Sequence, residues 1–249
     1  MDVSLYSAAA AMNATERWQD LVAENLSSSS VPGARQQEVS FSSVQAGMSA
    51  SAPGEPGNSF EIPSAGSSTN FSQGELKATG NNMDMAVEGP GFFTVQMPDG
   101  STAYTRDGEF ELNNQGRLTT KQGYPVASTG GTLTFDPSNS ATINVSAKGD
   151  VSQGGDSKGK LSITEFGNVN ALTMGNGGYY LADSPLAKPT PSATTNVRQG
   201  FSEASNTSPT LAMASLITSM RMFETNQKVM QMQSDRMSRA ITDLSGTSP

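Results

Sequence analysis

The C-terminal segment from Leu211 to Leu244 constrains the fold of this chain more than any other feature. Apolar side chains recur in it at alternating steps of four and three, interrupted by the polar residues Gln227 and Ser234, and the run contains neither Pro nor Gly. This spacing, kept over about four heptads, predicts a long helix whose narrow apolar seam packs against another helix as in a coiled coil. The predicted seam consists of Leu216, Met220, Phe223, Met230, Met237, Ile241 and Leu244.

A second helix is predicted at the other end of the chain, over residues 3–26. Its seam is thin and rich in Ala, which lets two helix backbones approach closely. We expect the two terminal helices to pair as an antiparallel coiled coil, completed by neighbouring subunits. The alternative is an ordinary amphipathic helix on a globular core. The seam of this helix is Leu5, Ala8, Met12, Val22 and Leu26.

The middle of the chain reads as β structure between two connectors. Residues 27–80 are dominated by Ser, Gly, Pro, Gln and Asn, and only residues 39–44 have the pattern of a strand. From residue 84 to about 185, short alternating runs are separated by turn residues, which is typical of antiparallel strands. The clearest hairpin surrounds the turn at residues 98–100.

The hairpin pattern also predicts which side chains share a face. Phe93, Val95 and Met97 alternate with polar or small residues, so they should line one face of their strand. We expect Tyr104, on the following strand, to lie opposite them.

These elements predict an α+β fold in which long N- and C-terminal helices pair as a coiled coil around an inserted antiparallel β-rich domain. The expected boundaries are a helix of the inner domain at 1–35, an extended connector at 36–80, and the β-rich domain at 81–185. A second connector at 186–208 and the C-terminal helix at 209–249 complete the chain.

The residue inventory argues against an enzyme. The chain has no His and no Cys, which excludes Ser-His-Asp triads, thiol nucleophiles and His or Cys metal sites. A catalytic pair of carboxylates, as in glycosidases, remains possible in principle. We interpret the candidates as solvated charges on a sheet; they are Glu88, Asp107, Glu109 and Glu111. We predict no catalytic, metal or cofactor site. Hydrophobic residues make up only 35% of the chain, which favours an elongated, turn-rich protein.

Charge and hydropathy limit the partners. A net charge of −8 argues against nucleic-acid binding. The sequence contains no run of 18 apolar residues that would predict a membrane-spanning helix, so no membrane insertion is expected. Asp2 stands where a cleaved secretory signal would carry a basic residue, so any export is expected to proceed without such a signal.

Three motifs, in order, resemble the bacterial flagellar basal-body rod proteins of the rod and hook axial class. They are the first helix (4–26), the stretch from Thr79 to Val126, and QGFSEASN (199–206) followed by residues 216–237. Together they cover somewhat over half of the chain. One departure lies at residues 27–33, where SSSSVPG replaces the usual continuation of the family. Chain length and Met-Phe-Glu at 222–224 favour the proximal over the distal rod class.

The resemblance implies a structural role. In this family the terminal helices form an inner domain, the β-domain packs outside it, and subunits pass unfolded through the flagellar type III export apparatus. The implied function is a rod subunit that polymerises through its terminal helices into the shaft that transmits torque from motor to hook. The implied location is the basal-body rod, and the implied partners are other rod subunits and the chain itself. A distal rod or hook-type subunit, or a secreted β-domain binding module, remains as an alternative.

Overall fold

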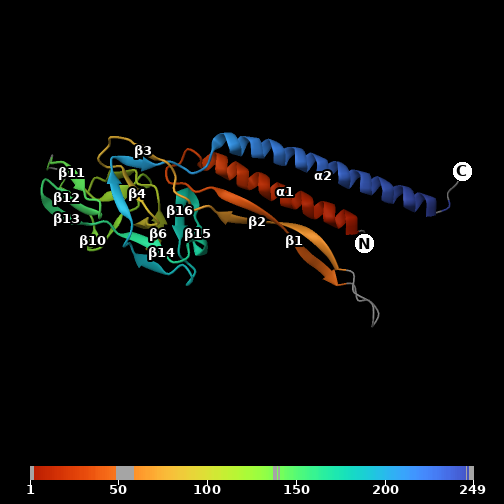
Figure 1. The fold of residues 1–249 in the computed structure, drawn as a ribbon, viewed down its shortest axis with the longest axis horizontal. Coiled ribbons are helices and arrows are strands. Elements are labelled where there is room, and N and C mark those ends of the chain that lie inside the picture. Colours follow the sequence, from red (N-terminus) through yellow and green to blue (C-terminus); the bar gives the residue numbers. More distant parts are fainter. Residues whose placement is uncertain (1–2, 49–58, 137–138, 140, 245, 247–249) are drawn as a thin grey trace. The chain divides into compact units, whose positions relative to one another are not determined.

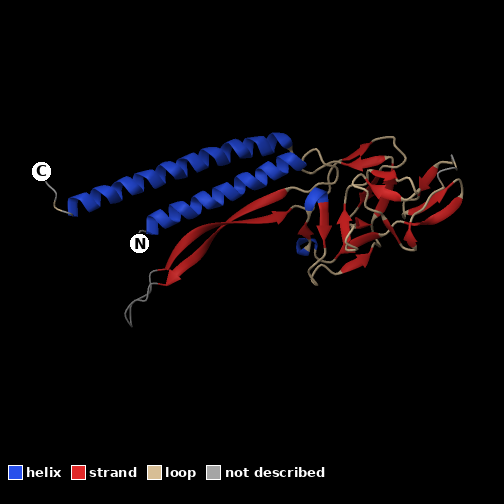
Figure 2. Cartoon of the chain, turned by 180° about the vertical axis from the view of Figure 1, so that it is seen from behind, coloured by secondary structure: helices blue, strands red, loops and turns tan. Residues whose placement is uncertain are grey.

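The computed structural model describes residues 3–48, 59–136, 139, 141–244 and 246. The chain forms two units. The first, here the helix unit, contains both helices and the two strands between residues 37 and 68. The second, here the β unit, contains residues 27–36 and 69–208. Figure 2 shows the helices and strands of each.

The helix unit is built on α1 (Val3–Ser28) and α2 (Pro209–Leu244). Pro209 at the first position of α2 suits a helix start, because a first-turn residue has no intrahelical acceptor for its N–H. The helices lie side by side and run in opposite directions (Figures 1 and 2). The first residue of α1 and the last residue of α2 therefore lie toward the same end of this unit.

A two-stranded ribbon of β1 (Gln37–Met48) and β2 (Ser59–Thr69) also packs on α1. The rings of Trp18 and Phe41 meet edge to face, with centroids 5.6 Å apart. Arg17 Nη1 donates to the carbonyl of Ala65 at 3.3 Å. The side-chain amide of Asn25 bonds both backbone groups of Gln37 at 2.7 Å. The stretch read from sequence as a connector with one short strand thus contains two long strands.

The predicted fold class needs correction. Two α-helices, one near each end of the described chain, flank a β-rich middle, and these helices do pack against each other. A coiled coil, however, is not what the structure shows. The face of α2 toward α1 carries polar residues at Ser219 and Asn226, and α1 also packs on the β1–β2 ribbon. A coiled coil requires an apolar residue at nearly every seam position of helices that pair mainly with each other.

The β unit is organised around a six-stranded antiparallel sheet in the order β15-β16-β6-β5-β14-β17. The predicted hairpin is its centre, since β5 and β6 pair with Thr94 opposite Tyr104. The strands are β5 (Phe92–Gln96), β6 (Thr102–Thr105), β14 (Ile163–Phe166), β15 (Thr173–Met174), β16 (Tyr179–Leu181) and β17 (Pro189–Pro191).

Apolar clusters cover both faces of this sheet. Phe93 and Val95 belong to the larger cluster, against which Met97 packs, as the alternation predicted. Phe92 and Tyr104 belong to the second cluster. Successive side chains of a strand point to opposite faces. Tyr104 therefore lies on the face opposite to the predicted one, because its register partner is Thr94.

Shorter strands complete the β unit. β18 pairs with β4 and β19 with β3, so the segment before α2 runs beside the start of the β unit. Two short 3-10 helices lie at Val169–Ala171 and Asn176–Gly178. The remaining strands are β3 (Leu76–Ala78), β4 (Met85–Glu88), β7 (Phe110–Leu112), β8 (Leu118–Thr120), β9 (Ala127–Ser128), β10 (Gly131–Thr132), β11 (Ile143–Val145), β12 (Asp150–Gln153), β13 (Asp156–Lys160), β18 (Asn196–Gln199) and β19 (Phe201–Glu203).

Candidate assembly interface

The predicted seam of α1 lies largely inside the helix unit. Ala8 and Val22 are buried, and Met12 and Leu26 are half-buried. The side chain of Leu5 lies outside the described residues. Burial of Ala8 and Val22 fits the Ala-rich character of this face, which allows close packing of its neighbours.

The predicted seam of α2 divides into two groups. Leu216, Phe223, Met230 and Met237, every seventh residue, are half-buried. Met220 and Ile241, which should alternate with them, are exposed by 53% and 61%. The side chain of Leu244 is outside the described part of the chain.

The face that α2 turns toward α1 is shifted by one residue from the predicted one. The half-buried positions 216, 223, 230 and 237 belong to both faces. On the observed face they alternate with residues 219, 226 and 233, whereas on the predicted face they alternate with 220, 227 and 234. Ser219 is fully buried, and Asn226 Nδ2 donates to Thr15 Oγ1 on α1 at 3.1 Å. We call this face the α1-facing seam. In this contact the polar residues Ser219 and Asn226 alternate with half-buried apolar side chains, while further large apolar side chains of α2 lie outside it.

Those outer side chains form two apolar stripes on α2. Met213, Ile217 and Met220 make the first stripe, at steps of four and three, and each is more than half exposed. Leu211 and Met222, also more than half exposed, make the second. At about 100° per residue the two stripes lie on opposite sides of the α1-facing seam. The helix therefore presents apolar surface on both flanks of its contact with α1.

A buried charge cluster in the β unit was not found from the sequence. Arg35 Nη2 lies 2.7 Å from Glu203 Oε1, and Arg106 Nη1 lies 3.4 Å from Glu203 Oε2. Burial lowers the pKa of Arg106 to about 10, helped by the nearby Arg35 and opposed by Glu203, so Arg106 stays charged at neutral pH. Its guanidinium also lies over the ring of Phe92, 4.7 Å from the centroid.

The sequence offered only weak signals for this cluster. Arg106 and Glu203 lie within the quoted motifs, but Arg35 and Glu203 are 168 residues apart. Nothing local in a sequence pairs residues at that separation. Glu203 is the last residue of β19, in a stretch interpreted from the sequence as a connector, so its role as an ionic partner was not predicted.

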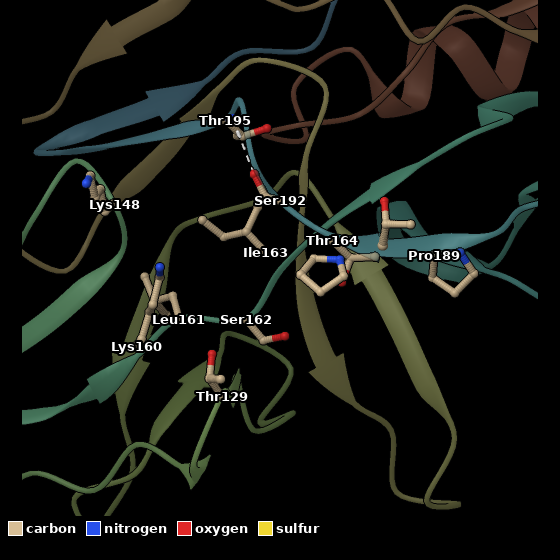
Figure 3. A pocket seen from close by; sticks show the side chains of 12 residues that line it. Thr129, Lys148, Lys160, Leu161, Ser162, Ile163, Thr164, Pro189, Ser192 and Thr195 are labelled. Carbon is tan, nitrogen blue, oxygen red and sulfur yellow. Dashed lines mark hydrogen bonds between the residues drawn. The ribbon is translucent and has the colours of Figure 1, made fainter.

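The β unit also contains a hollow of about 380 Å³ (Figure 3). It is lined by residues of β14 and β17, by the end of β13 and by nearby loop residues. Lys148 and Lys160 lie at one side of it, and Ser192 and Thr195 at another. In the described part of the chain neither lysine forms a salt bridge. The described residues that line the hollow include no carboxylate, and so do not provide the paired acids of a glycosidase-like site.

Other chemical features are sparse. Within the ranges that the structure describes, His, Cys, Asp and Glu side chains nowhere gather in a group of three or more that could hold a metal ion. Of the described helices, none combines the length and apolar character needed to cross a membrane. The four acidic residues considered as catalytic candidates divide: Glu88 and Glu111 are exposed, while Asp107 and Glu109 are half-buried.

Comparison with known proteins identifies the class. Residues 86–153 match the family model described as flagellar hook protein FlgE/F/G D1 domain, and residues 198–243 match flagellar basal body rod FlgEFG protein C-terminal. The first match lies in the β unit, and the second contains most of α2. Both matches point to the axial proteins of the bacterial flagellum, as the sequence motifs did.

Similarity to individual proteins extends over the whole chain. The flagellar basal-body rod protein FlgF of Mesorhizobium japonicum is 32% identical over 100% of both chains. FlgF of Caulobacter vibrioides is 31% identical over 92% of this chain and 93% of its own. FlgG of Bacillus subtilis is 28% identical over 91% of this chain and 93% of its own. The chain belongs to the flagellar basal-body rod protein family, which confirms the resemblance.

Proposed function

We propose that this chain is a structural subunit of the flagellar basal-body rod that polymerises through its terminal helices. Exposed apolar stripes on both flanks of the α1-facing seam carry this proposal. Met213, Ile217 and Met220 are each exposed by 53–54% in the single chain. Full burial of such a side chain contributes roughly 1.5–3 kcal/mol, so covering the exposed half contributes about half of that and favours contact with neighbouring helices.

Two stripes on opposite flanks allow one α2 helix to contact two neighbouring subunits. Each contact joins different surfaces of two copies, or of this chain and another rod subunit. Head-to-tail contacts that do not close on themselves generate helical filaments. A rod built in this way transmits torque along its axis, since each subunit is held by several neighbours. We propose rod subunits and further copies of this chain as the partners.

Export and position within the rod are further parts of the proposal. We place the chain in the basal-body rod, delivered unfolded by the flagellar type III export apparatus and without a cleaved signal. Full-length similarity to FlgF proteins supports a proximal rod position. The function is structural, with no catalytic step, as expected of a chain without His or Cys.

Lysine substitutions on α2 test the assembly proposal. Met220→Lys and Ile217→Lys place a charge on the first stripe, where the monomer leaves the side chain exposed. We expect unchanged helix content by circular dichroism and loss of rod assembly, scored by the hooks that cells carry. The matched control is Thr225→Lys, at an exposed position outside both stripes.

Met230→Lys and Met237→Lys give a second comparison, because these half-buried residues belong to the α1-facing seam. We expect them to reduce helix content in the monomer as well as assembly. Normal hooks and swimming in the Met220→Lys and Ile217→Lys strains, with both variants stably expressed, would refute the proposal.

The alternative of a secreted binding module finds its one supporting observation in the hollow beside Lys148 and Lys160. Its chemistry suits a small anionic ligand, because two lysines that form no salt bridge with any described residue stand among hydroxyl groups. The double variant Lys148→Ala/Lys160→Ala separates the two functions. Rod assembly and swimming are expected to survive it, whereas a binding module would lose its function.

A further inference from the structure

We infer that Arg35, Arg106, Glu203 and Asn206 form a clamp that ties together the segments connecting the two units, and that force passing between the units is carried through it. We call these four residues the connector clamp. The inference rests on the proposed function, since it assigns a mechanical role within a rod subunit.

The path of the chain shows where such a device can act. The chain passes between the helix unit and the β unit four times, at residues 26/27, 36/37, 68/69 and 208/209. The crossing at 26/27 lies within α1, whereas the other three do not lie inside an α-helix and resist bending and twisting poorly, because each residue there has two soft backbone dihedral angles. Cross-linking the connecting segments to one another removes that freedom.

Asn206 holds three of these segments together. Its Nδ2 donates to the carbonyls of Asn70 at 2.9 Å and Ser72 at 3.0 Å, and its Oδ1 accepts from the backbone N–H of Gln36 at 2.7 Å. The N–H of Asn70 in turn donates to the carbonyl of Gln36 at 2.8 Å. The segments at 36/37, 68/69 and 208/209 therefore meet at one side chain.

Glu203 joins the same segments a few residues deeper in the β unit. Its Oε1 accepts from Arg35 Nη2 at 2.7 Å and from the N–H of Gly74 at 2.8 Å. Its backbone carbonyl accepts from the N–H of Gly33 at 2.7 Å. The Glu203 and Arg35 side chains are fully buried, so water does not compete for these charge-assisted bonds.

Arg106 connects the clamp to the central sheet. It directly follows β6, and its Nη2 donates to the carbonyl of Gly89 at 2.7 Å, just after β4. The backbone at Gly33 approaches it so closely that a Cβ atom there would lie 2.4 Å from the carbonyl carbon of Arg106. Gly33 also has a φ of +69°, which favours glycine.

The composition of the cluster supports a positioning role over a stabilising one. Two guanidinium groups share one carboxylate, and Arg35 Nε and Nη1 and Arg106 Nε have no hydrogen-bond partner among the described residues. Buried charges with unpaired donors cost folding free energy relative to an apolar core. Their directional bonds, however, fix the connectors in a way that sliding apolar contacts do not.

Two variants open the clamp in different ways. Asn206→Ala removes the amide that joins three segments and leaves the ion pairs in place. Gly33→Ala forces the first connector away from Arg106 without changing any charge. The matched control is Glu165→Gln, which weakens a different hydrogen-bonded carboxylate of the β unit that accepts from residues 192–195.

Hydrogen exchange on the full-length protein measures whether the clamp opens. In Asn206→Ala and Gly33→Ala, amides of residues 31–36 and 203–206 are expected to exchange at least tenfold faster, while β5 and β6 keep their protection. In the control, faster exchange is expected at residues 192–195 only. Unchanged exchange of the connectors in both clamp variants would overturn the inference.

Swimming under load measures the mechanical role. Strains with either clamp variant are expected to build hooks in normal numbers and to swim at wild-type speed in dilute medium. Their speed should fall at least twofold further than that of wild type or of the Glu165→Gln strain as viscosity is raised. The number of hooks tests the proposed assembly function separately: it should fall in the Met220→Lys strain and stay normal in the clamp strains.

Two results would contradict the inference in cells. One is an equal response to viscosity in the clamp, control and wild-type strains although the connectors exchange faster. The other is an absence of hooks in both clamp variants although their helices and β-core are folded, because the clamp would then act in assembly and not in force transfer.

Discussion

Asn226 Nδ2 on α2 donates a hydrogen bond of 3.1 Å to Thr15 Oγ1 on α1, across 211 residues of sequence. Thr15 is buried, and its own hydroxyl donates to the carbonyl of Ala11 at 2.7 Å. A polar pair in the middle of the helix contact fixes the register of the two helices at some cost in stability. This pair lies where an apolar seam was expected.

Replacing Asn226 of this pair by an apolar residue should stabilise the helix unit. Asn226→Leu removes one hydrogen bond but leaves Thr15 bonded to Ala11. We expect the free energy of unfolding to rise by about 1 kcal/mol, seen as a higher midpoint when thermal unfolding is monitored by the helical circular dichroism signal. Gln227→Leu, at the adjacent exposed position, is the control and should leave the midpoint unchanged. A lower midpoint for Asn226→Leu would show that the hydrogen bond is a net stabiliser.

The sequence predicted what local periodicity determines. It located both helices, because steps of three and four recur, and the hairpin around residues 98–100, because its turn residues separate two alternating runs. It placed Tyr104 on the wrong face, since register depends on turn geometry and not on hydrophobicity. It missed the length of β1 and β2, whose Ser- and Gly-rich composition resembles a linker.

The role of the seam residues as a subunit interface stays a prediction, and the face that α2 turns toward α1 was predicted only in part. The predicted and the observed seam have four residues in common, namely Leu216, Phe223, Met230 and Met237. They differ in the residues between these: position 220 and its heptad equivalents in the predicted seam, and position 219 and its heptad equivalents in the observed one. Hydrophobicity favoured Met220, whereas α1 contacts the face with Ser219 and Asn226. The sequence could not distinguish a seam within the chain from a surface kept for neighbours. The connector clamp was missed because its partners are distant in sequence.

A close backbone approach makes Gly108 irreplaceable. A Cβ atom at this position would lie 1.6 Å from the carbonyl oxygen of Met85, whose N–H donates to the Gly108 carbonyl at 2.9 Å. We expect Gly108→Ala to destabilise the β unit by about 3 kcal/mol or more in urea unfolding, because the backbone must separate there. Gly130→Ala, where the new Cβ meets open space, should change stability by less than about 0.5 kcal/mol. Equal stabilities of the two variants would contradict this reading.

Glu165 should make the β unit sensitive to acid. Burial acts to raise the pKa of its carboxyl, but hydrogen bonds from Thr195, Ser192 and Thr194 outweigh burial and lower the pKa to about 2. A lowered pKa contributes stability above the usual value near 4.5, and this contribution is lost as pH falls toward 2. We expect Glu165→Gln to cost about 1–2 kcal/mol at pH 7, allowing for partial exposure.

The difference between wild type and Glu165→Gln should shrink as pH is lowered from 4.5 to 2. Chemical denaturation at a series of pH values measures this. A difference that is constant across that range would show that the carboxylate charge contributes nothing beyond its shape.

Asp107 should have the opposite pH dependence. Burial raises the pKa of its carboxyl to about 6, and the neighbouring Glu109 and Asp84 act in the same direction. The folded protein therefore binds a proton more readily than the unfolded chain, so stability falls as pH rises from about 4 to 6. Asp107 Oδ1 accepts a hydrogen bond from the N–H of Glu109 at 3.0 Å. Asp107→Asn removes the buried charge and keeps an oxygen that can accept this bond.

We expect Asp107→Asn to exceed wild type in stability by about 1–2 kcal/mol at pH 7–8 and to equal it below pH 4. Asp107→Ala, which loses the acceptor, should be less stable than Asp107→Asn at every pH, because the N–H of Glu109 is left without this partner. Urea unfolding of the three proteins between pH 3.5 and 8 makes the comparison. A wild type that gains stability relative to Asp107→Asn as pH rises through 6 would show that the carboxylate is stabilised by its surroundings and not penalised by burial.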